Sequence, residues 1–338
     1  MSDSTILVAD IGGTNARFAI ADAVAAMPLV RDSIREFRVA DFPDCVAAAR
    51  QYLEDVDATI SHAAFSVAGP VANGCVKFTN SSWIIDSKSV GKSLGLDSLR
   101  LVNDFAAMSF GVSLLADSDV RAIGGPARTR FGAEDDQTFA VAGAGTGLGV
   151  GALLLRGKDV QVLQTEGGHM GFAPRDDEQV EILRILSARF GHVSNERLLS
   201  GGGLVNLYEA LAGIAGVAPE RLEPEDVTSR AESDGQPDRL CVRAIEIFCD
   251  VLGAVAGDLV LAFGAWDGVY LAGGLTPLLL PWIERGHLRV CFEAKGRFAS
   301  RMREVPLSAV LDTDAGLLGA AAYAVIAAGG SLIDSAQR

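Results

Sequence analysis

The stretch that decides the fold is ILVADIGGTNARFAI, residues 6–20. It consists of an apolar run, a short segment of glycine and threonine, and a second apolar run. This pattern predicts a β-hairpin rather than a strand followed by a helix. Glycines let backbone N–H groups approach and point at an anion, and the threonine adds a hydroxyl donor. The segment is therefore a candidate phosphate-binding turn.

A second stretch, FAVAGAGTGLGVGALLL at residues 139–155, repeats this pattern much later in the chain. One such hairpin is ordinary, but two with Gly-Thr at their tips can hold two ends of a polyphosphate. The usual glycine-rich nucleotide motifs do not fit. Gly91-Lys92-Ser93 ends like a P-loop, but Asp86 stands where that motif needs glycine. In the second stretch, Leu148 stands where a dinucleotide-binding turn needs its third glycine.

The composition is that of a globular protein, with 338 residues, 49% apolar and 21% charged. This length is enough for two domains, each with its own core. The formal net charge of −14 argues against a nucleic-acid partner, because binding to a phosphate backbone needs a basic face. It does not exclude ATP, which needs only one favourable pocket and a Mg²⁺ ion.

Cysteine usage and hydropathy indicate the compartment. Five scattered cysteines without a C-x-x-C pair are typical of reduced thiols rather than of disulfides or a zinc site. The N-terminus enters a strand directly, so nothing predicts export. The most apolar stretch, Val251–Phe263, is interrupted by Asp258 and is too short to span a bilayer. We therefore expect a cytoplasmic protein without a membrane partner.

Strands and helices alternate along the rest of the chain. We expect strands at Ser33–Arg38, Ala63–Val67, Leu99–Val102 and Val269–Ala272, and helices at Phe42–Leu53, Phe105–Ser113 and Ala315–Ala328. From Glu178 to Phe263 apolar residues recur at helical spacing. Within that region Val217–Asp238 carries prolines and many charges, which predicts an exposed helix-loop insertion. The small residues of the last helix predict close packing against another helix.

The order of these parts resembles a known family. A D-x-G-G-T hairpin, a strand ending in Asn-Asp, a G-x-G-T-G hairpin, a strand ending in Ala-Gly-Gly and a small-residue helix resemble the actin-like ATPase (ribonuclease H-like) fold. Within that fold the chain looks like a bacterial glucokinase of the hexokinase-related branch. The cysteine-rich zinc motif of the ROK sugar kinases is missing, which favours the non-ROK branch. The matching stretches are Asp10–Arg17, Leu101–Phe105, Gly143–Gly149, Glu166–Pro174, Gly191–Arg197, Leu199–Tyr208 and Phe292–Phe298.

The resemblance implies the overall organisation. It implies an α/β protein in which two α/β domains flank a nucleotide and sugar cleft. Residues 1–112 with 312–338 would form the small domain, and residues 113–311 the large one. It also implies a homodimer in contact through the large domain, with D-glucose and ATP as the small-molecule partners.

Asp104 follows the buried strand and stands next to Asn103. In an open α/β sheet, residues at the carboxyl ends of strands line the ligand crevice. A carboxylate there can orient a sugar hydroxyl and accept its proton late, while the terminal phosphoryl group of ATP moves across. An ordinary aspartate, with a pKa of about 4, does not deprotonate an alcohol beforehand. The dipeptide alone favours a helix N-cap. The resemblance favours a base at Asp104, with both residues on the sugar.

Glu166 and His169 share a Glu-Gly-Gly-His turn, in which two glycines allow both side chains to aim inward. A carboxylate and an imidazole suit vicinal hydroxyls, which need both acceptors and donors. A metal site is less favoured, because no two of the four histidines share a helix face at ligand spacing. The resemblance places Glu196 on the sugar too, whereas the bare sequence favours a solvated residue or an ion pair with Arg197.

Asp10 is the one acidic group in the first turn. The resemblance makes it the Mg²⁺ site, through water, because Mg²⁺ keeps much of its hydration shell. Gly273 and Gly274 would lie under the adenosine, and a plain turn is the alternative. The other implied nucleotide contacts are Ala9, Ile11, Gly12, Gly13, Thr14, Asn15, Gly145, Thr146 and Gly147. The border of the sugar pocket is expected at Thr79, Asn80 and Trp83.

The resemblance therefore implies a Mg²⁺-dependent kinase that converts D-glucose and ATP to glucose 6-phosphate, the first step of glycolysis. The nearest alternative is a hexose kinase with another or broader preference, because single hydroxyl orientations decide such specificity. A non-catalytic sugar-sensing regulator is a second alternative. No helix-turn-helix segment precedes Ile6, and Asp104 is intact, which disfavours it. An actin- or chaperone-type ATPase switch would leave the Glu-Gly-Gly-His turn unexplained.

Overall fold

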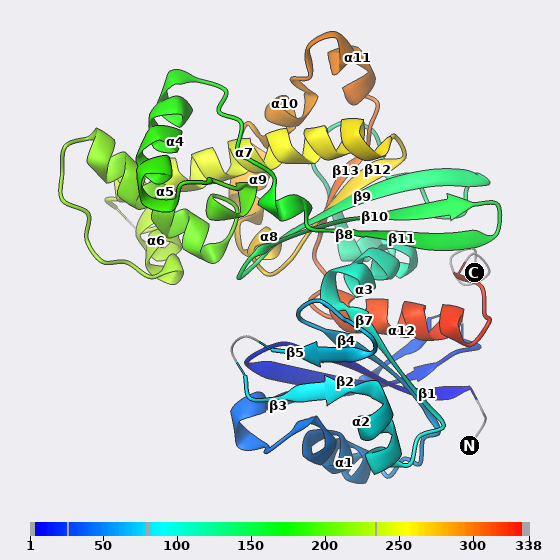
Figure 1. Ribbon diagram of the computed structural model, residues 1–338. Coiled ribbons are helices and arrows are strands. Elements are labelled where there is room, and N and C mark those ends of the chain that lie inside the picture. The colour runs from blue at the N-terminus through cyan, green and yellow to red at the C-terminus, as the bar shows by residue number, and fades with distance from the viewer. Residues whose placement is uncertain (1–3, 26, 79–80, 234, 333–338) are drawn as a thin grey trace.

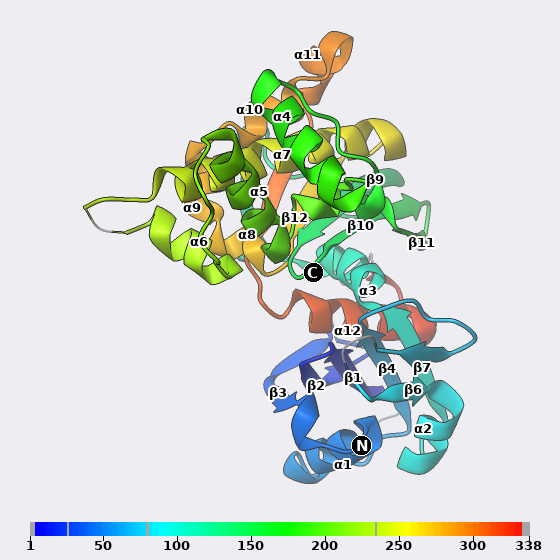
Figure 2. The ribbon, with the colours of Figure 1, turned by 60° about the vertical axis from the view of Figure 1, so that its left-hand side comes forward.

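The structure is a computed structural model that describes residues 4–25, 27–78, 81–233 and 235–332. Two lobes each contain one mixed β-sheet, and helices α3 and α12 lie between the two sheets (Figure 1). Figure 2, turned from that view, shows the same pair of helices where the lobes meet. Among the described residues no helix is long and apolar enough to cross a membrane.

The first lobe contains the sheet with strand order β3-β2-β1-β4-β7. Strands β1 to β3 are antiparallel, and β1, β4 and β7 are parallel. The strands are β1 (Thr5–Ile11), β2 (Asn15–Asp22), β3 (Leu29–Arg38), β4 (His62–Val67) and β7 (Ser98–Asn103). A two-stranded ribbon and two helices complete this lobe: β5 (Cys75–Lys77), β6 (Ile84–Asp86), α1 (Cys45–Asp55) and α2 (Ser87–Leu94).

The second lobe contains the sheet with strand order β11-β10-β9-β12-β13-β8. Apart from β8 at its edge, this sheet repeats the first one: three antiparallel strands, then parallel strands added beside the first of them. The strands are β8 (Val120–Ala122), β9 (Asp136–Ala144), β10 (Leu148–Arg156), β11 (Asp159–Thr165), β12 (Gly268–Ala272) and β13 (Leu307–Val310). The two hairpins predicted from the sequence are therefore equivalent parts of two similar sheets.

Helices cover one face of the second sheet. They are α4 (Asp177–Phe190), α5 (Gly201–Ile214), α6 (Pro224–Ala231), α7 (Arg239–Phe263), α8 (Leu275–Leu278), α9 (Leu280–Arg285), α10 (Leu288–Glu293) and α11 (Ala299–Met302). Short 3₁₀ turns are η1 (Val39–Asp41), η2 (Val112–Leu114), η3 (Asp117–Asp119), η4 (Gly167–His169), η5 (Asn195–Arg197) and η6 (Gly296–Phe298). Alternate residues of β9 face opposite cores: Ala140 and Ala142 pack under these helices, whereas Phe139 and Val141 face the other way.

Helices α3 (Asp104–Gly111) and α12 (Ala315–Ala327) pack against each other, as the small residues predict. A Cβ on Gly319 would lie 1.9 Å from the carbonyl oxygen of Ala107, and one on Gly111 would lie 2.8 Å from that of Ala315. Only glycine permits this approach at both positions. One hydrophobic cluster includes α12 and residues of both sheets, so the contact between the lobes is a continuous core.

Several predicted boundaries were wrong by a few residues. The strand expected from Ser33 begins at Leu29. The helix expected from Phe42 begins at Cys45, because the carboxylate of Asp44 accepts a hydrogen bond from the N–H of Ala47 and caps it there. The expected exposed helix-loop insertion is confirmed, since most of its described residues are exposed and it contains one helix. Its helix α6 buries Val227 and Ala231, one helical turn apart, in the large core.

Candidate active site

Asp10, the one acidic residue of the first turn, is held in place by an arginine of the same hairpin and by a serine of a neighbouring strand. Asp10 on β1 pairs in register with Arg17 on β2, and Nη2 of Arg17 lies 2.7 Å from Oδ2 of Asp10. The hydroxyl of Ser66 on β4 donates to Oδ1 at 3.1 Å. Nη1 of Arg17 also donates to the carbonyl of Thr313, just before α12. The sequence reasoning missed Arg17. Hairpin register is the signal that would have found it, because residues equidistant from a turn face each other.

The turn between β1 and β2 leaves its polar groups accessible. The N–H of Gly12 donates to the carbonyl of Asn15 at 2.9 Å, which closes the turn, and the side chains of Thr14 and Asn15 are exposed. The side chains of Ala9 and Ile11 are fully buried in the core of the first lobe. Those two predicted nucleotide contacts could therefore act only through their backbone.

Asp104 is the first residue of α3, and its neighbour Asn103 caps that helix. The Oδ1 of Asn103 accepts from the N–H groups of Phe105 and Ala106 at 3.0 and 3.1 Å. The N-cap that the dipeptide suggested is thus Asn103, which frees Asp104 from that role. Among the described residues, hydrogen bonds from neighbouring residues to the Asp104 carboxylate end on Oδ1, from the N–H of Phe105 (2.8 Å) and Nδ2 of Asn103 (3.0 Å).

The surroundings of Asp104 make its carboxylate more basic than usual. Burial, and next the negative charge of Asp10, raise the pKa of Asp104 to about 6. Burial disfavours the charged form, and so does a like charge nearby. A carboxylate with this pKa is still ionised at neutral pH, and it holds a proton more strongly than an exposed aspartate. Both properties suit a group that accepts a proton during a reaction.

The carboxylate beside the tip of the second hairpin belongs to a turn that lies far along the chain. Its tip is closed by a hydrogen bond of 2.9 Å from the N–H of Gly145 to the carbonyl of Gly147, and Thr146 is exposed. The N–H of Leu148 donates to Oε2 of Glu196 at 2.9 Å. A Cβ on Gly147 would lie 2.6 Å from that oxygen, so this glycine makes room for the carboxylate. Glu196 therefore lies against the turn predicted to meet phosphates.

The Gly273-Gly274 turn lies beside the second hairpin. It follows β12, whose last residue Ala272 pairs with Gly143 of β9. Gly273 has φ +85°, and a Cβ there would lie 2.3 Å from the carbonyl oxygen of Ala144. A Cβ on Gly274 would meet nothing within 4 Å, so that position is open. The structure thus brings the two predicted nucleotide turns of this lobe together.

A missed residue, Phe105, joins Asp104 to the second hairpin. Gly143 and Gly149 pair across β9 and β10, and a Cβ on either would lie 2.4 or 2.1 Å from the ring of Phe105. The ring therefore packs directly on this glycine pair. Because Phe105 follows Asp104, this contact fixes the start of α3 against the second lobe. These two glycines serve packing rather than anion binding.

The three predicted sugar residues of the second lobe lie together. Nε2 of His169 is 3.9 Å from Oε2 of Glu166, and its Nδ1 is 3.8 Å from Oε1 of Glu196. The side chains of Glu166 and His169 are 82% and 59% exposed, so they are accessible to a ligand. His169 thus stands between two carboxylates.

The backbone holds the two sugar turns together. Gly171 and Ser194 form a β-bridge, and the N–H of Asn195 donates to the carbonyl of Met170 at 2.8 Å. The ring of His192 reaches the carbonyl of His169 at 3.0 Å, so His192 supports the first turn from behind.

Of the three residues predicted to border the sugar pocket, the structure describes only Trp83. Trp83 is 2% exposed in the core of the first lobe, and its indole N–H donates to the carbonyl of Phe42. The prediction that Trp83 borders the sugar is therefore wrong, because that ring is a core residue. Thr79 and Asn80 lie outside the described residues.

The acidic residues fit a hydrated metal better than a fully coordinated one. Among the described residues no three histidine, cysteine, aspartate or glutamate side chains cluster as ligands. Mg²⁺ beside a nucleotide is typically held by one or two carboxylates, several waters and the phosphates. Asp10, with Asp104 close enough to feel its charge, fits that arrangement.

Comparisons with known proteins cover almost the whole chain. The family model described as glucokinase matches residues 7–327. A glucokinase of Stenotrophomonas maltophilia (strain R551-3) is 50% identical over 323 residues, covering 96% of each chain. The structure of a glucokinase from an Antarctic psychrotroph is similar, with a TM-score of 0.85, 32% identity, and coverage of 95% of this chain and 98% of that one. A glucokinase from Balamuthia mandrillaris in complex with glucose shares the fold, with a TM-score of 0.76, 20% identity, and coverage of 96% and 94%.

Proposed function

The chain belongs to the glucokinase family and phosphorylates glucose, and from this premise we propose how its own residues do so. ATP is the phosphoryl donor and Asp104 is the proton acceptor. The observation that carries the proposal is the position of Asp104. It lies at the carboxyl end of β7, at the start of a helix packed on the second glycine hairpin, with its pKa raised to about 6. The expectation that this strand is buried was wrong, because β7 is an edge strand in which only Val102 is buried.

In the proposed reaction the 6-hydroxyl of glucose attacks the terminal phosphorus of ATP. The bond from that phosphorus to the bridging oxygen breaks, and ADP leaves with the electron pair. The hydroxyl proton passes to a carboxylate oxygen of Asp104 late in the reaction, as fits a loose transition state. A single positioned base of this kind contributes about 10²–10⁴-fold to the rate.

Sugar recognition is assigned to the second lobe and to Asn103. Glu166 and Glu196 accept hydrogen bonds from hydroxyls of glucose, and His169 between them donates or accepts according to its tautomer. The short distances among these three side chains and the exposure of Glu166 and His169 support this assignment. Asn103 offers its amide beside Asp104, where it would orient the reacting end of the sugar.

Nucleotide binding is assigned to the three glycine turns. Gly12, Gly13, Thr14 and Asn15 from the first hairpin, and Gly145, Thr146 and Gly147 from the second, would meet the phosphates through N–H and hydroxyl groups. Gly273 and Gly274 would lie under the adenosine. Mg²⁺ bound to the phosphates would neutralise their charge. Asp10 would hold its hydration shell, because Arg17 and Ser66 keep that carboxylate oriented.

The remaining assignments concern the setting of the enzyme. The predicted domain boundaries, at 112/113 and 311/312, place the five-stranded sheet and α12 in one domain and the six-stranded sheet in the other. We also propose a homodimer in contact through the second lobe, and a cytoplasmic location. Sedimentation of the purified chain would test the first of these two, and fractionation of cells the second.

A coupled assay of phosphorylation tests the substrate assignment. Glucose, mannose, fructose and galactose would be compared with ATP, ADP and inorganic polyphosphate as donors. We expect the highest kcat/KM for glucose with ATP. A higher value for another hexose would favour a kinase of different sugar preference. Glucose binding without turnover for any donor would instead favour a sugar-sensing regulator.

A further inference from the structure

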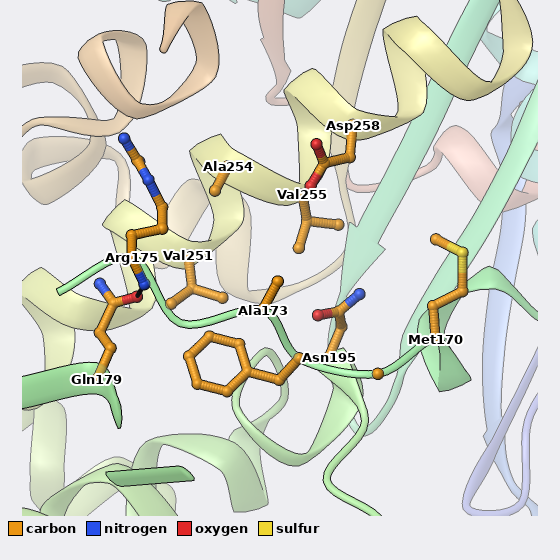
Figure 3. A pocket seen from close by; sticks show the side chains of 11 residues that line it. Met170, Ala173, Arg175, Gln179, Asn195, Val251, Ala254, Val255 and Asp258 are labelled. Atoms are coloured by element: carbon orange, nitrogen blue, oxygen red, sulfur yellow. Dashed lines mark hydrogen bonds between the residues drawn. The ribbon is translucent and has the colours of Figure 1, made fainter. Parts of the chain in front are cut away.

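A cavity of about 210 Å³ lies behind the two sugar turns, between the segment that follows His169 and helix α7 (Figure 3). One wall consists of Val251, Ala254 and Val255. Arg175 and Gln179 lie at one end of the cavity, and Asn195 and Met170 lie toward the other. A cavity of this size accepts a small organic molecule, since an apolar cavity of about 150 Å³ already binds benzene.

Two buried amides face this cavity. The side chain of Asn195 belongs to a residue that is 5% exposed, and its amide makes no hydrogen bond to the described residues. Gln179 is 3% exposed, and its Oε1 accepts from the N–H of Arg175, which leaves its NH₂ group for another partner. Among the described residues no fully buried side-chain nitrogen or oxygen lacks a hydrogen-bond partner, so the amide groups left without one are accessible from the cavity. They are available to donate to an occupant or to accept from it.

The charge at the cavity favours an anion. Asp258 at the rim is paired with Lys295, whose ammonium lies 2.5 Å from its Oδ1. Asp250 is within electrostatic reach of Arg175, but Arg243 and His287 share its charge. The guanidinium of Arg175 also interacts with the thiol of Cys291, but burial raises the pKa of that thiol, which therefore stays neutral and does not cancel the charge. Arg175 is the one cationic residue among those that line the cavity. A planar guanidinium matches a carboxylate.

The cavity shares its wall with the sugar site. Met170 directly follows His169, and Asn195 directly precedes Glu196. A hydrogen bond of 2.8 Å from the N–H of Asn195 to the carbonyl of Met170 joins the two backbone segments. A molecule that contacts Met170 and Asn195 therefore contacts the two joined segments that position the side chains of His169 and Glu196.

We propose that this cavity binds a small organic acid and that its occupancy changes the affinity for glucose. The carboxylate lies on Arg175, the apolar body lies on the wall of α7, and a polar group at the far end meets Asn195. The coupling rests on the proposed sugar site, whereas the binding itself does not. Two ligands coupled in this way change each other's affinity by the same factor.

Calorimetric titration of the full chain, without glucose or nucleotide, tests the binding. The probe is 4-hydroxyphenylacetate, which has a carboxylate, an apolar ring and a distal hydroxyl, and the neutral control is 4-hydroxyphenylacetamide. We expect the amide to bind about tenfold more weakly, because it loses the charge-assisted bond. Arg175→Gln should remove this difference, and Arg175→Lys should retain part of it.

Two variants that fill the cavity separate this site from any other. Ala254→Leu adds bulk on α7, and Ala173→Phe adds it from the exposed segment opposite, where folding is less at risk. Both should abolish probe binding. Absence of saturable binding to the native chain at millimolar probe, or unchanged binding in the folded Ala173→Phe chain, would overturn the proposed site.

The coupling is measured as the dissociation constant of glucose with and without saturating probe. We expect a change of about fivefold or more, and the same factor for the probe with and without saturating glucose. An unchanged constant would overturn the coupling while leaving the cavity site. Failure of the native chain to bind glucose without probe would instead contradict the proposed sugar site.

Discussion

The two glycine hairpins occupy equivalent places in two similar sheets, yet they differ in where their carboxylates come from. In the first, Asp10 belongs to the hairpin and is held by Arg17 of the same hairpin. In the second, the carboxylate is that of Glu196, from a turn far along the chain. The first lobe also supplies Asp104, whereas the second supplies Glu166 and His169. Under the proposed roles both hairpins would meet the phosphates, while the first lobe would supply the base and the second lobe most of the sugar contacts.

The largest effect should come from removing the base of the first lobe. Asp104→Asn keeps the size and the hydrogen bonding of the side chain but cannot accept a proton at neutral pH. We expect kcat to fall by about 10²–10⁴-fold, with the dissociation constant of glucose within tenfold of the native value. Coupled assays and calorimetry would measure both. Asp104→Ala should be equally inactive and should bind glucose less well. Near-normal turnover of Asp104→Asn would contradict the assignment of the catalytic base to Asp104 in the first lobe.

The next effect should come from the second lobe and should fall on affinity. Glu166→Gln replaces a charge-assisted hydrogen bond by a neutral one, which costs on the order of 1–3 kcal/mol of glucose binding. The affinity for ATP should hardly change. Glu181→Gln is the matched control, because Glu181 is an exposed residue of α4 paired with Arg184. Loss of nucleotide binding with glucose binding retained would contradict the assignment of Glu166.

A third test asks whether the second hairpin also positions the base. Gly149→Ala places a methyl group 2.1 Å from the ring of Phe105, so that ring and the start of α3 must shift. We expect a loss of stability of about 1–3 kcal/mol, seen in denaturant unfolding, together with a lower kcat. Gly213→Ala, whose Cβ would make only an ordinary contact with Ile185, should do neither. Recovery of kcat in Gly149→Ala with Phe105→Leu would identify the ring as the cause, and full activity of Gly149→Ala alone would contradict it.

A fourth test concerns the stability cost of the base. The folded-state pKa of Asp104, about 6, is above its unfolded value, so its contribution to stability is present at low pH and is lost as the pH rises through 6. Asp104→Asn should therefore be more stable than the native chain at pH 7.5, by up to about 3 kcal/mol, and the gain should shrink by about half at pH 5. Asp117→Asn should show no gain, because Arg128 and Arg130 lower the pKa of Asp117. If the increase in the free energy of unfolding did not depend on pH, the ionisation of Asp104 would not be what destabilises the native chain.

The smallest effect should be a change of shape. We expect glucose to bring the lobes closer, with rotation about the start of α3 and about α12, which would exclude water and limit hydrolysis of ATP. Small-angle X-ray scattering should show a slightly smaller radius of gyration with glucose, and galactose would serve as a control. An unchanged radius together with rapid hydrolysis of ATP without glucose would contradict closure.

The sequence predicted the elements whose signal is local. Both hairpins and the close packing of α12 follow from periodicity and from small residues, and the structure confirms them. Helix starts were less predictable, because a cap such as Asp44 decides them within a residue or two.

The parts that the sequence could not predict depend on contacts between distant segments. The sequence around Gly149 does not indicate that the ring of Phe105 packs there. Likewise, the sequence around Leu148 does not indicate that its N–H donates to the carboxylate of Glu196. Trp83 was misplaced for a related reason: an indole suits either a sugar or a core, and only the packing of the first lobe decides between them. The roles of the site residues remain predictions that the variants above would test.

The bridge between Gly171 and Ser194 has a consequence for how the family can diversify. Because it joins the turn of His169 to the turn of Glu196, an insertion or deletion in one turn displaces the backbone of the other, whereas a side-chain substitution leaves the bridge intact. Under the proposed roles, a change of sugar preference that alters the length of either turn would therefore require a matching change in the other. Asp104 sits on another helix and can be inherited unchanged. Grafting the two turns together, rather than either alone, is the rational unit for transferring specificity between such enzymes.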